Sequence, residues 1–358
     1  MRNGIAARHL AVAACASLAL ACGREEPGDG ALAAPQAGSA VTDAGVAGAA
    51  APAIAGRPAD PGALGDLEAI LQTGAPEPDA LLTAIARVGG SGDRRAPALL
   101  TPLVLDPAGD DAVRARAAVA LAQVDPRAAT AALQRLDPWV LSAALDHVRG
   151  IPFSDSEPFF RALLGAPISQ DAKREAIAAL ADSSTEAASL LVEVASRAPD
   201  PALRATAVDA IAFMPDAGLA PIALATLPAH ERAPEVRASL YRVLTHYAGA
   251  LPPGPGSDAL LRSVLAERDP AVRLEGCALV AELVRAHDDA KARESFERVL
   301  VPWLAREAVR GASRPARLRA VAALGLAGGA PAAEALAKLA DSREPEVADA
   351  ARTALASR

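Results

Sequence analysis

The chain has 358 residues, of which 52% are hydrophobic and only 3% aromatic, and its formal net charge is −7. So few aromatic side chains disfavour cores built on bulky rings, and the many Ala, Leu and Val residues favour helices packed closely through small side chains. The chain has no block of Lys and Arg, so the electrostatic footprint of a nucleic-acid-binding protein is missing. Two of the three cysteines lie in the first 22 residues, which leaves no disulfide framework and no Cys-rich zinc site in the body of the chain.

Residues 1–21 are predicted to be a signal peptide. Arg2 and Arg8 give the segment a positive start, and Leu10 to Ala21 form an apolar run of 12 residues. A helix that spans a bilayer needs roughly 20 apolar residues. The run therefore indicates export and not a membrane-spanning helix.

The end of this run, Ala19-Leu20-Ala21-Cys22, resembles the lipobox of bacterial lipoproteins. The resemblance implies that Cys22 is acylated and becomes the first residue of the mature chain, although Ala19 stands where Leu is usual. It also implies an outer-membrane lipoprotein facing the periplasm, because Gly23 is not the Asp that often retains such proteins at the inner membrane. The alternative is an A-x-A site for ordinary signal peptidase, which would give a soluble periplasmic protein.

Cys15 ends a second stretch with lipobox-like letters, but only a short apolar core precedes it, so Cys22 is favoured. Residues 22–60 are then predicted to be a disordered tether, because Ala, Gly and Pro dominate them and apolar periodicity is absent. A flexible segment of this length has a root-mean-square reach of about 35 Å. An irregular surface segment of a globular domain is the alternative, and it is uncommon at this length.

From residue 61 to residue 358 one sequence pattern recurs. Its clearest copy is 269–284, "DPAVRLEGCALVAELV", in which Asp-Pro precedes an Arg and an apolar run. Most copies are about 30 to 36 residues apart, a period typical of repeat architectures. With the Arg as position 0, the copies place the following residues there: Leu81, Arg114, Leu141, Lys173, Arg204, Arg237, Arg273, Arg317 and Ala348.

The pattern has a physical basis in helix capping and packing. Asp, Glu or Ser before Pro caps a helix whose first position tolerates Pro, since no partner is needed there for an N–H. Position +3 is Ala or Gly in most copies, which lets neighbouring helices approach closely, and positions −1, +3, +4 and +7 form one apolar face. A second apolar helix is predicted between copies, as at 96–106 and 186–200.

The recurring pattern resembles the HEAT-repeat family, in particular the short HEAT-like repeats of phycobilisome lyases. The resemblance covers about residues 62–358 and implies an all-α fold. This fold would be an α-solenoid of about nine stacked helix pairs, with the second helix of each pair lining the concave face. The resemblance is weaker at Leu141 and Ala348, which lack the basic residue, and at 282–311, which is too long for one repeat and predicts extended helices.

The same resemblance implies a structural role for the basic residues at position 0. They are expected to stack against acidic caps as a ladder through the array, and no catalytic role is expected for them. The residues of this ladder are Arg114, Lys173, Arg204, Arg237, Arg273 and Arg317.

The sequence indicates no catalytic or metal-binding constellation. The histidines of the repeat region lack H-x-x-x-H or H-E-x-x-H spacing. The single His-Glu pair, His230-Glu231, falls short of the several pairs that HEAT-like di-iron hydroxylases use. Cys277 lies at an apolar position, as expected for a buried and inert thiol. We therefore expect a non-enzymatic protein that binds no metal or other cofactor.

Exposed positions of the inner face, +2 and +5, carry charges of mixed sign, which disfavours nucleic acid as a partner. Residues 137–160 hold four of the nine aromatic residues of the chain. These aromatics are candidate anchors for a protein partner, or else they fill a junction between repeats where Ala is too small. They are Trp139, Phe153, Phe159 and Phe160.

The leading functional hypothesis is a non-catalytic scaffold or adaptor, anchored by lipid at the bacterial cell envelope, that holds a protein partner on its concave face. One alternative is an accessory enzyme such as a chromophore lyase, which rests on analogy of fold alone. The other alternative is a soluble exported spacer within a larger envelope assembly.

Overall fold

The computed structural model describes residue 60 and residues 62–74, 77–214, 216–287 and 290–357. All of these residues belong to one compact unit, Gly56–Arg358. The expected signal peptide at 1–21, the acylated Cys22 and the expected tether up to residue 59 lie outside the described residues.

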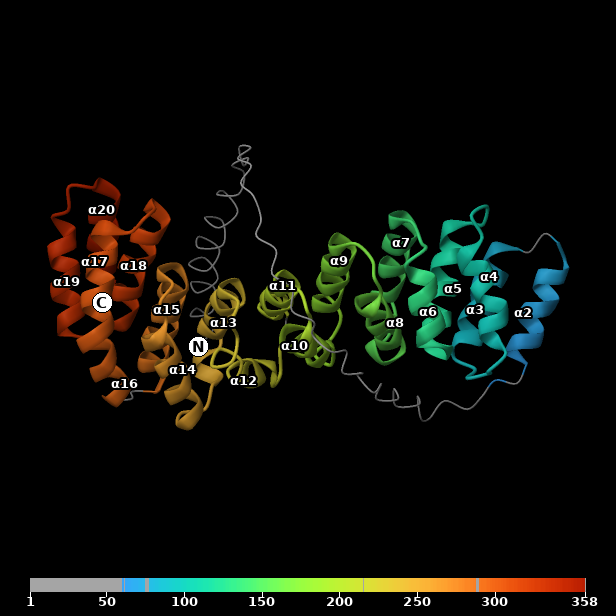
Figure 1. The fold of residues 1–358 in the computed structure, drawn as a ribbon, viewed down its shortest axis with the longest axis horizontal. Helices are drawn as coiled ribbons and strands as arrows, with labels where there is room; N and C mark the ends of the chain where they lie inside the picture. The colour runs from blue at the N-terminus through green and yellow to red at the C-terminus, as the bar shows by residue number, and fades with distance from the viewer. Residues whose placement is uncertain (1–59, 61, 75–76, 215, 288–289, 358) are drawn as a thin grey trace, which may run out of the picture. The chain divides into compact units, whose positions relative to one another are not determined.

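The described part of the chain is built from pairs of helices, of which we call the first the A helix and the second the B helix (Figure 1). The A helices are α2 (Ala63–Gln72), α4 (Ala96–Leu105), α6 (Pro126–Leu133), α8 (Phe153–Gly165), α10 (Ala187–Arg197), α12 (Ala220–Leu224), α14 (Pro255–Ala266), α16 (Ala290–Ser295) with α17 (Val301–Arg310), and α19 (Ala330–Ala340). The B helices are α3 (Pro78–Gly89), α5 (Asp111–Val124), α7 (Pro138–Val148), α9 (Gln170–Ala181), α11 (Pro201–Ile211), α13 (Pro234–His246), α15 (Pro270–His287), α18 (Arg314–Ala327) and α20 (Pro345–Ala356). Each copy of the sequence pattern thus coincides with a B helix, and the described residues include no strand.

Side chains just before the B helices cap them as the pattern predicts. The Asp200 carboxylate accepts a hydrogen bond from the backbone N–H of Ala202 at 2.9 Å, and the Ser169 hydroxyl accepts one from Ala172 at 3.2 Å. Caps of this kind typically stabilise a helix by about 1 kcal/mol. Five further B helices are capped in the same way, by Glu77, Asp110, Asp137, Asp269 and Ser313.

Stacking of the B helices builds the core, because each B helix contacts the next one along the chain. Position +3 is buried in every B helix. At Gly276 of α15, an added Cβ would lie 2.7 Å from Cγ2 of Val264 in the A helix α14 and 3.3 Å from Cδ2 of Tyr241 in the preceding B helix α13, so the close approach of α15 and α14 favours glycine. The +3 residues are Ala84, Ala117, Ala144, Ala176, Ala207, Leu240, Gly276, Ala320 and Ala351.

The long stretch 282–311 contains extended helices, as its length predicts. Helix α15 runs for 18 residues, and α16 continues through a π-helical turn, η2 (Phe296–Leu300), directly into α17. Phe296 and Leu300 of this turn are buried. A short 3-10 helix, η1 (Ala248–Ala250), precedes α14. The described part of the chain is therefore an all-α solenoid of stacked, HEAT-like helix pairs.

Candidate functional site

The arginine at position 0 connects its own A–B loop to the next repeat. Arg237 of α13 donates to the carbonyl oxygen of Arg232 at 2.6 Å and, through Nε and Nη2, to both carboxylate oxygens of Glu267 at 2.7 and 3.1 Å. Only 17% of the Arg237 side chain and 6% of the Glu267 side chain are exposed. The geometry is that of a two-pronged guanidinium–carboxylate pair, which fixes orientation as well as charge.

The protonation states of this pair follow from its surroundings. The hydrogen bond to Glu267 raises the pKa of Arg237 above its ordinary value. Burial raises the pKa of Glu267, but the hydrogen bonds from Arg237 and from backbone N–H groups outweigh burial and leave the pKa lowered. Both groups are therefore charged at neutral pH, and the pair is an ion pair.

Three other arginines make equivalent rungs between consecutive repeats. In each, the guanidinium donates to an acid just before the next B helix and to a backbone carbonyl of its own repeat, which lies in the A–B loop for Arg204 and Arg317 and in the last turn of α4 for Arg114. These rungs are Arg204 with Glu231 at 3.0 Å, Arg317 with Glu344 at 2.9 Å and Arg114 with Asp137 at 3.2 Å.

The ladder is interrupted at the remaining position-0 residues. Leu141 has no charge to contribute, and the Lys173 side chain forms no ion pair within the described residues. Arg273 also forms no ion pair there, and its guanidinium lies 4.9 Å from the centre of the Trp303 ring. The rungs therefore join some repeats and not others.

Removing one partner of the Arg237–Glu267 rung is expected to destabilise the fold. Because the pair is more buried than a surface ion pair but not fully desolvated, we expect a coupling energy of about 1–2 kcal/mol. A double-mutant cycle of Arg237→Met and Glu267→Gln, measured by urea unfolding, tests this value. A coupling energy near zero would show that the rung is only a surface contact.

A second row of polar contacts crosses the exposed surface of the B helices, which we call the B-helix face. Arg319 of α18 pairs with Glu275 of α15 at 3.0 Å, and Ser142 of α7 donates to Glu175 of α9 at 3.0 Å. Both signs of charge are thus present and largely paired with each other. This surface lacks the continuous positive stripe that tracks a phosphate backbone.

Another part of the same row lies between α11 and α13, where Arg242 and Ser239 both donate to Asp209, at 3.4 and 3.2 Å. Burial raises the pKa of Asp209, and Arg242 and Ser239 partly counteract that effect. Two positions expected on the exposed face are in fact buried: Ser239 is 3% and Val119 2% exposed. The packing of adjacent B helices covers them, so the expectation was wrong at these two positions.

His147 of α7 lies half-buried in the region of Arg116. Burial, together with the positive charge of Arg116, lowers the pKa of His147 to about 4. In the folded chain this imidazole is therefore neutral at neutral pH.

Acidification is expected to destabilise the fold through His147. Between about pH 6.5 and pH 4 the unfolded chain binds a proton at this residue and the folded chain does not, so the free energy of unfolding falls as the pH falls. Urea unfolding at pH 7.5 and pH 4.5 measures the loss, which should be smaller in His147→Gln. Equal losses in the two proteins would contradict the assignment.

The aromatic residues of 137–160 do not share one environment. Phe159 and Phe160 are 0% exposed and meet edge to face, with ring centroids 6.1 Å apart. Phe153 is half-buried, whereas Trp139 is 80% exposed at the start of α7. Phe159 and Phe160 therefore fill the core and offer no surface to a partner, which corrects the expectation of a four-residue anchor and leaves Trp139 as its exposed member.

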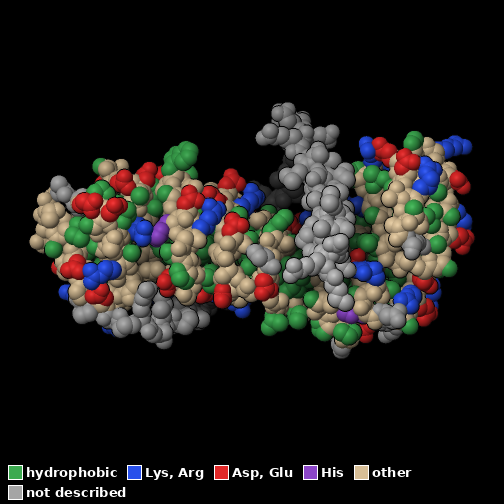
Figure 2. Space-filling view, turned by 180° about the vertical axis from the view of Figure 1, so that it is seen from behind, with side chains coloured by type: hydrophobic (Ala, Val, Ile, Leu, Met, Phe, Trp, Pro, Cys, Tyr) green, Lys and Arg blue, Asp and Glu red, His purple; other side chains and the backbone are tan. Residues whose placement is uncertain are grey.

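An apolar patch that sequence reasoning missed lies around α12. Phe213 and Leu219 are each 79% exposed and Ile222 is 43% exposed. Figure 2 shows hydrophobic side chains gathered near the middle of the lower edge of the molecule. Helix α12 has only five residues, so the outer layer is thin at this repeat. The sequence carries one signal for this patch: the apolar stretch that forms α12, between two loops, is short.

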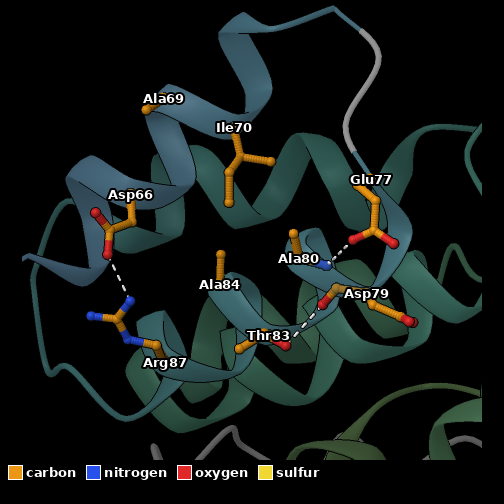
Figure 3. A pocket seen from close by; sticks show the side chains of 9 residues that line it. All are labelled: Asp66, Ala69, Ile70, Glu77, Asp79, Ala80, Thr83, Ala84 and Arg87. Carbon is orange, nitrogen blue, oxygen red and sulfur yellow. Dashed lines mark hydrogen bonds and ion pairs between the residues drawn. The ribbon is translucent and has the colours of Figure 1, made fainter.

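An open pocket of about 580 Å³ lies between α2 and α3 (Figure 3). Its polar groups are engaged with one another: Arg87 donates to Asp66 at 2.6 Å, and Glu77 caps α3 by accepting from Ala80 at 3.0 Å. The pocket thus presents a partly neutralised wall and no arrangement suited to acid–base chemistry.

Other candidate reactive groups are engaged or buried. Glu231 of the single His-Glu pair is bound to Arg204. Cys277 is 0% exposed, and burial raises its pKa to about 12, so it stays a protonated thiol. Among the described residues there is no cluster of three or more His, Cys, Asp or Glu side chains arranged to hold a metal ion.

No described helix is both long enough and apolar enough to cross a bilayer. The stacked helix pairs define the class of protein, which is an α-solenoid. Proteins of this class typically serve as protein-binding scaffolds.

Comparison with known proteins does not identify this protein more closely than its class. No family model and no curated protein matches the sequence. The crystal structure of Kap121p is similar over 83% of this chain, with 14% identity and a TM-score of 0.40, and this chain spans only 37% of the Kap121p chain. Human deoxyhypusine hydroxylase in complex with glycerol is similar over 73% of this chain and 95% of its own, with 19% identity and a TM-score of 0.23. Neither likeness carries a functional argument for this chain.

Proposed function

We propose that this chain is a non-catalytic protein-binding scaffold, held at the bacterial cell envelope by a lipid on Cys22. The observation that carries the proposal is the uninterrupted stack of B helices, whose exposed side offers one broad face. Solenoids present such extended faces to partners because each repeat adds a further strip of surface.

The chemistry of the B-helix face favours a protein partner. Its exposed charges alternate in sign, as in Glu275 with Arg319, so a partner would meet complementary charges of both kinds. Large exposed apolar side chains, Trp139 and Phe213 among them, are further candidate anchors.

The partner surface is tested by site-specific photo-crosslinking in cells. A crosslinker at Ala178, which is exposed on α9, should capture one envelope protein reproducibly. The same group at Glu334, exposed on the A helix α19, is the matched control and should not capture it. Equal capture at both sites, or none at Ala178, would count against the B-helix face. A spectral change on addition of a bilin would favour the accessory-enzyme alternative.

Envelope anchoring is proposed from the apolar run that ends at Cys22. Mass spectrometry of the mature N-terminus should find a diacylglyceryl group on Cys22, and Cys22→Ser should release the protein from the membrane fraction. A mature chain with an unmodified Cys22 would support the soluble exported alternative instead.

A further inference from the structure

One rung of the arginine ladder has no acid. In the other rungs the carboxylate comes from the loop directly before the next B helix, as Glu267 does for Arg237. For Arg273 of α15 the corresponding loop is 311–313, Gly-Ala-Ser, which contains no carboxylate. The loop is held in place by Arg317, which donates to the carbonyl oxygen of Gly311 at 2.9 Å.

Arg273 is consequently a cation with unused hydrogen-bond donors. Its Nε is buried and has no hydrogen-bond partner within the described residues. The guanidinium lies over the ring of Trp303, 4.9 Å from its centre. A guanidinium has five N–H donors, and burying one without an acceptor is unfavourable. The ring contact compensates for part of the missing charge but accepts no in-plane hydrogen bond.

We propose that Arg273 and Trp303 form a binding site for a carboxylate of a protein partner, either an Asp or Glu side chain or a C-terminal carboxylate. The equivalent position in the other rungs is occupied by a carboxylate, so the array itself shows which group fits the guanidinium. Both Arg273 and Trp303 are only half-buried, which leaves the outer guanidinium nitrogens within reach of a partner.

Because Arg273 stacks on Trp303, it is better suited to binding a carboxylate in one defined orientation than to neutralising a nearby negative charge. Stacking on Trp303 fixes the plane of the guanidinium, so its in-plane donors are already oriented for a two-pronged contact. Arg237 shows a two-pronged contact of this kind, with Nε and Nη2 on the two oxygens of Glu267 at 2.7 and 3.1 Å. The Nε of Arg273 is buried, so a partner's carboxylate is expected to meet its two Nη nitrogens instead. The site rests on the proposed scaffold function, because its ligand comes from the bound protein.

Tryptophan fluorescence gives a direct readout, since the chain has only two tryptophans. In Trp139→Phe, the emission comes from Trp303 alone. Titration of the full mature chain with sodium acetate should change that emission saturably, and sodium chloride at equal ionic strength should not. Adding Arg273→Gln should abolish the acetate response. Identical responses to acetate and chloride, or a response that survives Arg273→Gln, would overturn the proposal.

A second variant supplies the missing carboxylate from within the chain. Ser313 already caps α18, and Ser313→Asp keeps a capping oxygen while placing a carboxylate as Asp137 is placed for Arg114. Ser313→Asp should raise the midpoint of thermal unfolding and remove the acetate response, and it should do neither when combined with Arg273→Gln. An unchanged acetate response in folded Ser313→Asp would contradict the site.

The two proposals fail separately. If acetate binds as expected but no envelope protein is captured by crosslinking, Arg273 and Trp303 bind a carboxylate, but the scaffold function fails and with it the assignment of that carboxylate to a protein partner. If a partner is captured equally well by the wild-type chain and by Arg273→Gln, the scaffold function stands and Arg273 has no part in it.

Discussion

Replacing Phe159 by Ala is expected to lower the free energy of unfolding by about 3–5 kcal/mol, the usual cost of emptying a buried aromatic site. Phe159 is 0% exposed, and its ring meets that of Phe160 edge to face, so the substitution removes both buried area and a ring contact. The value is obtained by urea unfolding followed by far-ultraviolet circular dichroism.

Trp139→Ala is the matched control for that experiment. The side chain is 80% exposed, so its loss should change the free energy of unfolding by no more than about 0.5 kcal/mol. Similar costs for the two substitutions would mean that the core does not lie where the structure places it.

Enlarging a small, buried residue of a B helix should also destabilise the fold. Ala176 of α9 occupies position +3 and is 0% exposed, so Ala176→Leu inserts three carbon atoms into a closely packed interface. Overpacking of this kind typically costs about 1–3 kcal/mol. The measurement is the midpoint and slope of urea unfolding.

Ala178→Leu makes the same chemical change two residues further along α9, at an exposed position. Helix propensity is nearly the same for both substitutions, so only burial distinguishes them. We expect the Ala178→Leu protein to unfold within about 0.5 kcal/mol of the wild type. If Ala176→Leu were equally harmless, small residues at position +3 would not be what lets neighbouring helices pack closely.

The repeat register could be predicted from the sequence because its signals are local. A capping side chain before Pro and small residues at position +3 mark each B helix, and both depend only on spacing within one helix. The positions of Ala207 and Ala320, both 0% exposed, follow directly from that spacing.

Features that depend on contacts between repeats could not be predicted from the sequence in the same way. Neither the burial of Ser239 nor that of Phe160 follows from helical periodicity, because the neighbouring helix decides which residues beside the apolar face are covered. The contact between Arg273 and Trp303 joins residues of different repeats across the irregular stretch with the π-helical turn. The exposed patch at Phe213 arises because α12 is too short to cover its surroundings.

Central to this account is that each helix pair is stabilised by its immediate neighbours and not by one shared core. Hydrogen exchange on a chain ending after Gly328, which removes α19 and α20, tests this most directly. In a nearest-neighbour stack, amide protection should fall in α18 and α17 and stay unchanged in α3 and α5 at the opposite end of the sequence. Loss of protection to the same extent in α3 and α5 would contradict the stacked-repeat account.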